Sequence, residues 1–198
     1  MTATIRLATD ADAPATAEIY GPAVGTPATF EFEAPDAAEM QRRIRETLAF
    51  HPWLVCDLDG RVAGYAYATR HRSRIGYQWS VETSVYVHGD FQRRGVGRAL
   101  YRSLLAILAA QGHFNAYAGI TLPNPASVAL HESVGFRPLT VYRNVGFKLG
   151  AWQDVGWWHA ELRPYAASPP FPIPVPALLA GPSWRTLLDA GLDHLKPC

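Results

Sequence analysis

The most regular alternation of apolar and polar residues lies between positions 81 and 87. The odd positions hold Val, Thr, Val and Val, whereas the positions between them hold Glu, Ser and Tyr. This period of two predicts a strand with two different faces. After a turn rich in glycine and arginine, apolar residues recur at helical spacing, at Leu100, Leu104, Ile107 and Leu108. Gly112 follows where a helix often ends in the left-handed conformation, so the pattern predicts a strand, a basic glycine loop and a helix in that order.

Apolar runs upstream of this unit predict three more strands. They cover 5–8, 54–58 and 62–68, and Asp59-Gly60 between the last two is a strong signal for a hairpin turn. The joining segment 70–78 is cationic and leads directly into the strand at 81–87.

Two capping signals predict helices in the same part of the chain. Thr9 with Asp12 opens a helix towards Tyr20, and Asp36 with Glu39 opens another. The second helix has an apolar face made of Met40, Ile44 and Leu48. The segment 21–35 contains three prolines and two glycines, which predicts that it cannot continue the first helix and forms a loop.

Downstream of Gly112 the pattern predicts a strand at 116–121, a helix at 126–134 closed by Gly135, and strands at 139–142 and 155–162. Helices interspersed with hairpins and single strands predict an α/β (α+β) fold around a mixed sheet. We expect this domain to cover residues 1–165.

The composition changes abruptly after residue 165, so residues 166–198 are expected to form a proline-rich C-terminal extension. The prolines of 166–182 favour extended polyproline geometry, which excludes a helix or a core strand there and predicts a strap along the surface, with partner recognition as the alternative. A short amphipathic helix could follow, with apolar positions at Trp184, Leu187, Leu188, Leu192 and Leu195. It would dock on the body or on a second subunit, which leaves a homodimer open.

Composition excludes several classes of protein. Charged residues make up 18% of the 198 residues and the net charge is +1, so no global field favours nucleic acid or an anionic membrane. The N-terminus lacks an apolar signal core and no run is long enough to span a bilayer, so we expect a cytoplasmic protein. Cys56 and Cys198 are the two cysteines, which argues against a disulfide scaffold and against a zinc site.

The glycine loop after the strand suits anion binding. Backbone N–H groups at a helix N-terminus attract phosphate, Gly95 and Gly97 let a ligand approach the backbone, and the neighbouring arginines add positive charge. The alternative is a tight turn beside a solvated basic patch. A dinucleotide fingerprint is excluded because its third glycine would fall on Leu100, and the P-loop spacing is also absent.

Two motifs resemble those of the GCN5-related N-acetyltransferases. Gln92-Arg-Arg-Gly-Val-Gly97 is similar to the family's pyrophosphate loop, and the segment 124–136, which ends in Gly-Phe, is similar to its second signature. The segments 79–87, 130–132 and 146–155 resemble the phosphinothricin and methionine sulfoximine acetyltransferase branch. The resemblance covers about residues 5–162. It implies a mostly antiparallel central sheet flanked by helices, with acetyl-CoA bound where the central strands splay apart.

The resemblance also implies which residues hold acetyl-CoA. The backbone of the central strand would bind the pantetheine arm, the glycine loop would bind the pyrophosphate, and an asparagine would lie near the pantetheine. These residues are Val85, Tyr86, Val87, Arg93, Arg94, Gly95, Val96, Gly97, Arg98 and Asn124.

Two residues are expected to be catalytic. Glu82 points to the face opposite the valines of its strand and is the expected general base, although a structural ion pair with a nearby arginine is the alternative. His131 occupies the position where many relatives have a tyrosine that acts on the thiolate. It would act as thiolate stabiliser, acid or second base, unless it is a structural histidine. No spaced partner suggests metal ligation.

The amine acceptor implied by the resemblance is a small amino acid with an anionic side group, held by cationic and aromatic residues. The candidates are Phe30, Arg72, Arg74, Trp79 and Lys148. The two aromatic residues could equally be core residues, and the cationic loop could simply be solvated. A small-molecule N-acetyltransferase therefore competes with a protein or peptide N-acetyltransferase and with a non-catalytic acyl-CoA-binding module.

Overall fold

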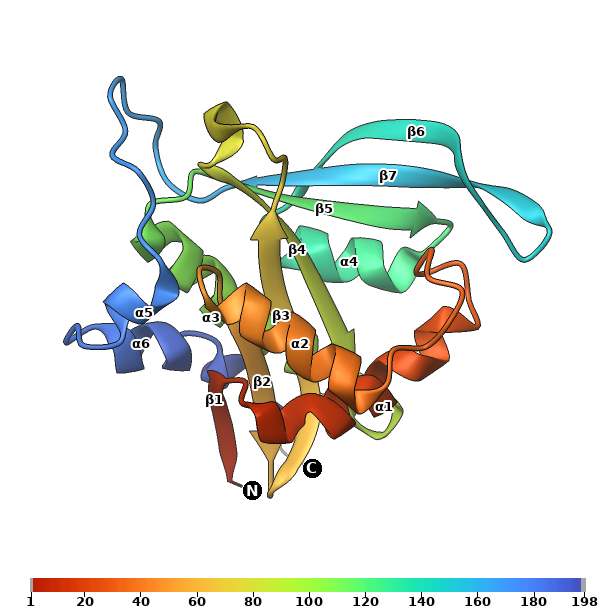
Figure 1. Ribbon diagram of the computed structural model, residues 1–198, viewed down its shortest axis with the longest axis horizontal. Helices are drawn as coiled ribbons and strands as arrows, with labels where there is room; N and C mark the ends of the chain where they lie inside the picture. Colours follow the sequence, from red (N-terminus) through yellow and green to blue (C-terminus); the bar gives the residue numbers. More distant parts are fainter. Residues whose placement is uncertain (1, 197–198) are drawn as a thin grey trace.

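The computed structural model describes residues 2–196, which form one seven-stranded sheet with helices on both faces (Figure 1). The strand order is β1-β2-β3-β4-β5-β7-β6, and only the β4–β5 pair is parallel. The strands are β1 (Ala3–Leu7), β2 (Trp53–Leu58), β3 (Arg61–Arg70), β4 (Ser80–Val87), β5 (Asn115–Leu122), β6 (Arg137–Lys148) and β7 (Ala151–Glu161). The predicted mixed α/β fold is confirmed.

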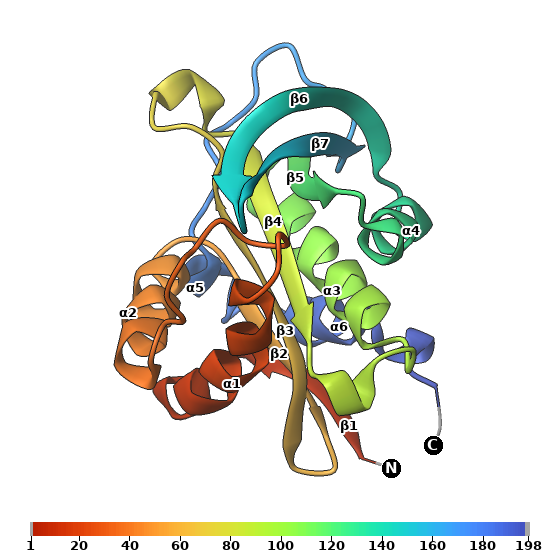
Figure 2. The same cartoon turned by 90° about the vertical axis from the view of Figure 1, so that its right-hand side faces the viewer.

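The helices divide between the two faces of the sheet, as Figure 2 shows. One face carries α1 (Ala13–Val24) and α2 (Ala37–Leu48), and the other carries α3 (Val96–Gln111) and α4 (Pro125–Ser133). The C-terminal helices α5 (Val175–Leu178) and α6 (Trp184–Asp189) pack on α3. Short 3-10 turns are η1 (Asp10–Asp12), η2 (Ile75–Tyr77), η3 (Gly89–Phe91) and η4 (Leu192–His194).

Each face of the sheet has its own hydrophobic core. The larger core lies between the sheet and α3, whose Leu100, Leu104 and Leu108 are fully buried as the helical pattern predicts. The smaller core joins Met40 and Ile44 of α2 to the aromatic side of β2 and β3. The alternation in β4 thus has a physical cause, because its two faces meet different helices.

The central sheet splits between β4 and β5. These strands pair only over three residues, from Ser80 opposite Asn115 to Glu82 opposite Tyr117, and then diverge (Figure 1). Residues 83–87 of β4 therefore present an edge to the gap without a β5 partner. An unpaired strand edge can bind an extended ligand through its backbone N–H and C=O groups.

The local signals for turns and caps are confirmed. The Asp36 carboxylate accepts a 2.8 Å hydrogen bond from the Glu39 N–H at the start of α2. Asp59 and Gly60 have φ of 52° and 82°, as a tight hairpin turn requires. Gly112 ends α3 with φ of 101°.

Three boundaries differ from the prediction. Helix α1 continues past Tyr20 and includes Pro22. Because Pro22 lies two residues before the end of the helix at Val24, few helical hydrogen bonds are lost. Strands β6 and β7 are much longer than predicted, since a turn with positive φ at Leu149 and Gly150 joins them into one long hairpin. Within the proline-rich segment, α5 forms one helical turn with Pro176 in its first positions, where a missing N–H costs nothing.

Candidate active site

A cavity of about 710 Å³ occupies the gap where β4 and β5 diverge. Both faces of β4 line it, because Val85 and Val87 lie on the α3 side and Ser84 and Tyr86 on the other. Among its lining residues are nine of the ten predicted for acetyl-CoA: Val85, Tyr86, Val87, Arg93, Gly95, Val96, Gly97, Arg98 and Asn124. The tenth residue, Arg94, does not line the cavity. Its guanidinium lies 5.3 Å from the centre of the Phe91 ring.

The glycine loop forms the basic end of this cavity. Gly95 precedes α3 with φ of 82°, a conformation that favours glycine, and a Cβ atom on Gly97 would lie 2.9 Å from the Leu130 side chain of α4. The first turn of α3 has N–H groups that no helical carbonyl can satisfy. Among the described lining residues, Arg93, Arg98 and Lys196 are cationic and none is a carboxylate. This chemistry fits the phosphate groups of acetyl-CoA.

His131 is buried in α4 at the side of the same cavity and its hydrogen bonds are defined. Its Nδ1 lies 2.7 Å from the carbonyl oxygen of Ser127, and its Nε2 lies 2.7 Å from the hydroxyl of Tyr101. Since a carbonyl can only accept, Nδ1 carries the proton and Nε2 accepts from Tyr101. Burial lowers the pKa of His131, which keeps the ring neutral, and raises the pKa of Tyr101.

Glu82 lies at the end of the parallel β4–β5 pairing, on the face of β4 opposite Val81 and Thr83. Its side chain is 33% exposed, and its Oε1 accepts from His71 Nδ1 at 2.9 Å and from Arg72 at 3.1 Å. The carboxylate thus has a fixed position and remains open to a partner. The ion pair with an arginine, which was the structural alternative, is present and does not enclose the carboxylate.

Aromatic rings hold His71 in place beside Glu82. The imidazole stacks on Tyr117 of β5 with a centroid distance of 4.5 Å, and the edge of Trp157 lies beyond it. Tyr117 is also the residue opposite Glu82 in the parallel register. Residues from β4, β5, β7 and the loop after β3 therefore converge on the point where the sheet splits.

A second cavity, of about 320 Å³, lies beside the first. It is lined by aromatic and apolar groups, among them Phe30, and it shares Ala28, Gly119 and Thr121 with the larger cavity. Trp157 also lines it, and among the described residues nothing hydrogen-bonds the buried indole N–H of Trp157. The two cavities thus meet at β5.

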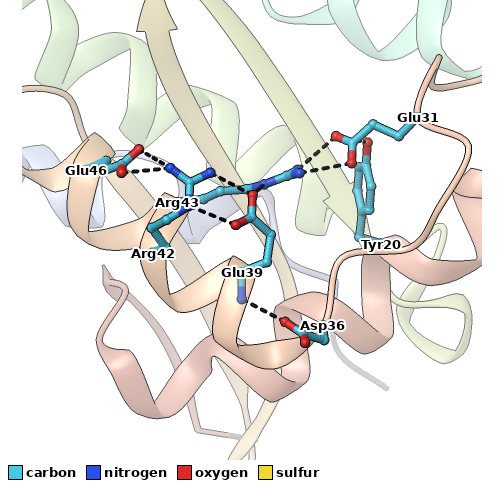
Figure 3. A network of polar contacts seen from close by, with 7 residues as sticks. All are labelled: Tyr20, Glu31, Asp36, Glu39, Arg42, Arg43 and Glu46. Carbon is cyan, nitrogen blue, oxygen red and sulfur yellow. Dashed lines mark hydrogen bonds and ion pairs between the residues drawn. The ribbon is translucent and has the colours of Figure 1, made fainter.

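The loop that carries Phe30 is tied down at both sides. Arg43 of α2 donates two hydrogen bonds to the Glu31 carboxylate, at 2.8 and 3.0 Å, and Tyr20 of α1 donates a third at 2.9 Å (Figure 3). From the opposite side, the buried ammonium of Lys148 donates to the carbonyl of Thr29 at 2.6 Å. The Arg43 guanidinium lowers the pKa of Glu31, so the contact between these two residues is an ion pair.

The five predicted acceptor residues do not come together. Phe30 lines the second cavity, Arg72 contacts Glu82, and Lys148 fixes the loop that bears Phe30. Arg74 lies exposed in the loop before β4. The indole N–H of Trp79 donates a 2.8 Å hydrogen bond to the carbonyl of Pro170, and its ring stacks on Phe171. Trp79 therefore fixes the C-terminal segment.

Sequence analysis missed several residues of the site. Tyr101 lies next to the apolar stripe of α3, so its helical position suggested only packing. Trp157 had no signal beyond its place in a strand. His194 and Lys196 line the larger cavity although they lie in the C-terminal extension, and no local pattern predicts that contact.

Two further observations concern ions and membranes. Within residues 2–196, no three His, Cys, Asp or Glu side chains gather where they could hold a metal ion. No helix in this part of the chain is both long and apolar enough to cross a bilayer. Cys56 is a free, buried thiol, whereas Cys198 lies outside the described residues.

Comparison with known proteins gives consistent matches. The family model described as an acetyltransferase (GNAT) domain matches residues 5–157. The phosphinothricin N-acetyltransferase of Streptomyces viridochromogenes is 38% identical over 170 residues, which are 85% of this chain and 92% of that protein. The L-methionine sulfoximine/L-methionine sulfone acetyltransferase of Salmonella typhimurium is 37% identical over 167 residues, which are 83% of this chain and 97% of that protein.

A solved structure agrees in fold. The phosphinothricin acetyltransferase of Sinorhizobium meliloti in complex with acetyl-CoA superposes with a TM-score of 0.80 and 36% identity, over 86% of this chain and 94% of that one. The split sheet, the glycine loop at the start of α3 and these matches lead to one conclusion. The chain belongs to the GNAT acetyltransferase family.

Proposed function

We propose that this N-acetyltransferase transfers the acetyl group of acetyl-CoA directly to the α-amine of a small amino acid with an anionic or strongly polar side group, of the phosphinothricin or methionine sulfoximine type. The observation that carries the proposal is the meeting of two cavities at the split of the sheet. One has the size and charge for a nucleotide thioester, and the other is a small aromatic pocket. The names of the similar enzymes support the same acceptor class.

In this proposal the coenzyme binds along the larger cavity. Its phosphates contact Arg93, Arg98 and the first turn of α3, and its pantetheine arm pairs with the free edge of β4 at 85–87. Asn124, which caps α4 and lines the cavity, lies beside that arm. The thioester then lies near the split, between Glu82 on one side of the sheet and His131 on the other.

Glu82 removes the proton from the acceptor ammonium, directly or through one water. The neutral nitrogen attacks the thioester carbon, the C–S bond breaks, and the acetyl group passes to the amine. His71 and Arg72 both contact Oε1 of Glu82, so Oε2 is the oxygen best placed to take the proton. His71 and Arg72 therefore position the base.

The departing thiolate needs a proton donor or a hydrogen bond. The Tyr101 hydroxyl donates to the neutral His131 ring, so the two residues form one unit at the cavity wall. We propose that the Tyr101 hydroxyl turns from His131 to donate its hydrogen bond to the departing thiolate, which then takes its proton from solvent, where the proton removed by Glu82 is released. The raised pKa of Tyr101 keeps the hydroxyl protonated.

The acceptor lies in the smaller cavity, against the rings of Phe30 and Trp157. In this proposal Arg72 and Arg74, both exposed in the loop before β4, attract the anionic groups of the acceptor. Charge-assisted contacts of this kind discriminate anionic acceptors from simple amines.

The test is thiol release from acetyl-CoA with phosphinothricin, methionine sulfoximine, glutamate, a neutral amine and a short peptide as acceptors. We expect the highest kcat/KM for the first two and little release with the peptide. Equal rates with all five compounds, or preference for the peptide, would contradict the proposed acceptor class. The Arg74→Gln variant should lose several-fold in kcat/KM for the anionic acceptors alone, and equal loss for every acceptor would exclude a binding role for Arg74.

We also propose that two copies of the chain pair through the β6–β7 hairpin. β6 is the edge strand of the sheet, and large apolar side chains lie exposed on the hairpin, at Leu139, Val145, Phe147, Leu149 and Trp152. Such a patch on an edge strand is typical of an interface. Light scattering should give twice the chain mass, and Trp152→Arg should reduce it to the mass of one chain. A wild-type protein of single-chain mass at micromolar concentration would disprove the dimer.

A cytoplasmic location is the last part of the proposal. The free thiol of Cys56 and the use of a thioester coenzyme support it. Fractionation of cells that express the tagged chain tests this location, and recovery outside the cytoplasmic fraction would contradict it.

A further inference from the structure

The segment from residue 163 to residue 196, which we call the C-terminal strap, lies beyond the part of the chain that matches the GNAT family model. It leaves β7, passes the start of β4, and continues through α5 and α6, which pack on α3, towards the glycine loop (Figures 1 and 2). Its last described residues lie beside the start of α3. The strap therefore contacts both ends of α3.

Specific contacts hold the first half of the strap. Gln111 at the end of α3 donates from its side chain to the carbonyl of Ile173 at 2.8 Å and accepts from the Ile173 N–H at 2.9 Å through its own carbonyl. Val175 of the strap is buried in the larger core. This half is an integral part of the fold.

The second half lies directly against α3. Ser103 donates to the carbonyl of Leu188 at 2.6 Å and accepts from the N–H of Gly191 at 3.2 Å. A Cβ atom on Gly191 would collide with the carbonyl oxygen of Ala99, so only glycine permits this approach. The backbone after Gly191 is thus directed along α3 towards its N-terminus.

The end of the strap reaches the glycine loop itself. The N–H of Lys196 donates to the carbonyl of Arg94 at 3.0 Å, and the carbonyl of His194 lies where a Cβ atom of residue 95 would be. Both His194 and Lys196 line the larger cavity together with Arg93 and Arg98. The glycine at 95 therefore meets a second requirement, close contact with the strap, besides its left-handed conformation.

We propose that the strap is part of the coenzyme site and that the Lys196 ammonium binds a phosphate group of acetyl-CoA. This inference rests on the proposed function, which places the phosphates at the glycine loop. Among the described residues that line the cavity, Lys196 is the one ammonium, and the lining offers no carboxylate that would neutralise it. Because its backbone is bonded to the loop, Lys196 stands beside the bound phosphates without a large ordering cost.

The experiment measures the Kd of acetyl-CoA by calorimetry, without acceptor, for the wild type, Lys196→Gln and Arg185→Gln. Arg185 is the matched control, since it is an exposed cation of the same strap that pairs with Asp189 and does not line the cavity. We expect Lys196→Gln to raise Kd about fivefold, as loss of an exposed charge-assisted contact should, and Arg185→Gln to leave it unchanged. Melting curves confirm that both variants fold.

A second arm repeats the titration with dephospho-coenzyme A, which lacks the 3′-phosphate. If the effect of Lys196→Gln persists, the contact is to the diphosphate, and if it vanishes, the contact is to the 3′-phosphate; either result supports the proposal. A Kd for Lys196→Gln within twofold of the wild type, or an equal loss in Arg185→Gln, would overturn it. Failure of the wild type to bind acetyl-CoA would instead overturn the proposed function.

Discussion

At the scale of single residues, the position of Glu82 follows from two constraints that act at one point. Val81 and Thr83 must face the α3 core, which turns Glu82 to the other side of the sheet, and the β4–β5 pairing ends at the same residue. The carboxylate consequently lies where the two strands begin to diverge, and His71 and Arg72 hold it there. The proposed role of Glu82 as general base needs this combination of fixed position and access.

Glu82→Gln should lower kcat about 100-fold, the usual loss when a general base is removed, while the Kd of acetyl-CoA stays unchanged. Thiol release over a full pH range and calorimetric titration measure the two quantities. Glu46→Gln is a suitable control, since this exposed carboxylate on α2 pairs only with Arg42 among the described contacts. A turnover close to that of the wild type would remove Glu82 from the mechanism.

Tyr101 and His131 form the second pair to which we assign a catalytic role. Tyr101→Phe should reduce kcat about tenfold and leave both KM values within twofold, because the lost hydroxyl acts on the departing thiolate and not on binding. The cost in folding stability should be about 1 kcal/mol, the size of one net hydrogen bond. Steady-state kinetics and urea unfolding check both numbers, and an unchanged kcat would assign the pair to structure alone.

At the scale of elements, an ion pair with helix α2 helps to position the loop between α1 and α2. Glu31 has a two-point contact with Arg43 of α2, while Arg42, the neighbour of Arg43, points outward to Glu39 and Glu46 (Figure 3). The same loop presents Phe30 to the smaller cavity. Helix α2 therefore controls one wall of the proposed acceptor pocket from outside it.

Arg43→Gln should raise the KM of the amino-acid acceptor about three- to tenfold, since both groups are partly exposed and the two-point contact is worth roughly 1 kcal/mol. The Kd of acetyl-CoA should not change. Arg42→Gln is the matched control because it removes a neighbouring guanidinium with similar partners on α2 but no tie to the loop. Equal effects of the two substitutions would mean that the loop does not depend on Arg43.

At the scale of the whole molecule, buried histidines link stability to pH. The rings of the half-buried His51 and the buried His113 stack with a centroid distance of 5.5 Å, and burial lowers their pKa to about 4 and about 3, respectively. In the unfolded chain both titrate near 6.5. Below that pH the unfolded state binds protons that the folded state does not, so stability decreases as pH falls.

We expect the free energy of unfolding to fall by a few kcal/mol between pH 6.5 and pH 5, a window in which carboxylates remain largely ionised. Urea unfolding at several pH values measures the slope. His113→Leu, which removes one of the two titrating rings, should make the slope shallower. Parallel curves for this variant and the wild type would show that the histidine pair does not control acid stability.

Local signals were sufficient for the elements that depend on neighbouring residues. The alternation in β4, the apolar stripe of α3, the caps at Asp36 and Gly112 and the Asp59-Gly60 turn are set by interactions within a few residues, so the sequence predicted them correctly. The glycine loop belongs to the same class, because its glycines and arginines directly precede the helix and can be recognised within a few residues. The order of strand, loop and helix thus came from the sequence by itself.

Tertiary structure decided what depends on segments far apart in the chain. Pairing between β6 and β7 makes both strands longer than the local pattern predicts. Trp79, a predicted acceptor residue, contacts Pro170 and Phe171 of the strap. The hydrogen bond between Tyr101 and His131 joins residues 30 apart in the chain, and the approach of Lys196 to the glycine loop joins residues about 100 apart. Such contacts are fixed when the two cores pack against opposite faces of the sheet, and local periodicity carries no information about which distant side chains then meet.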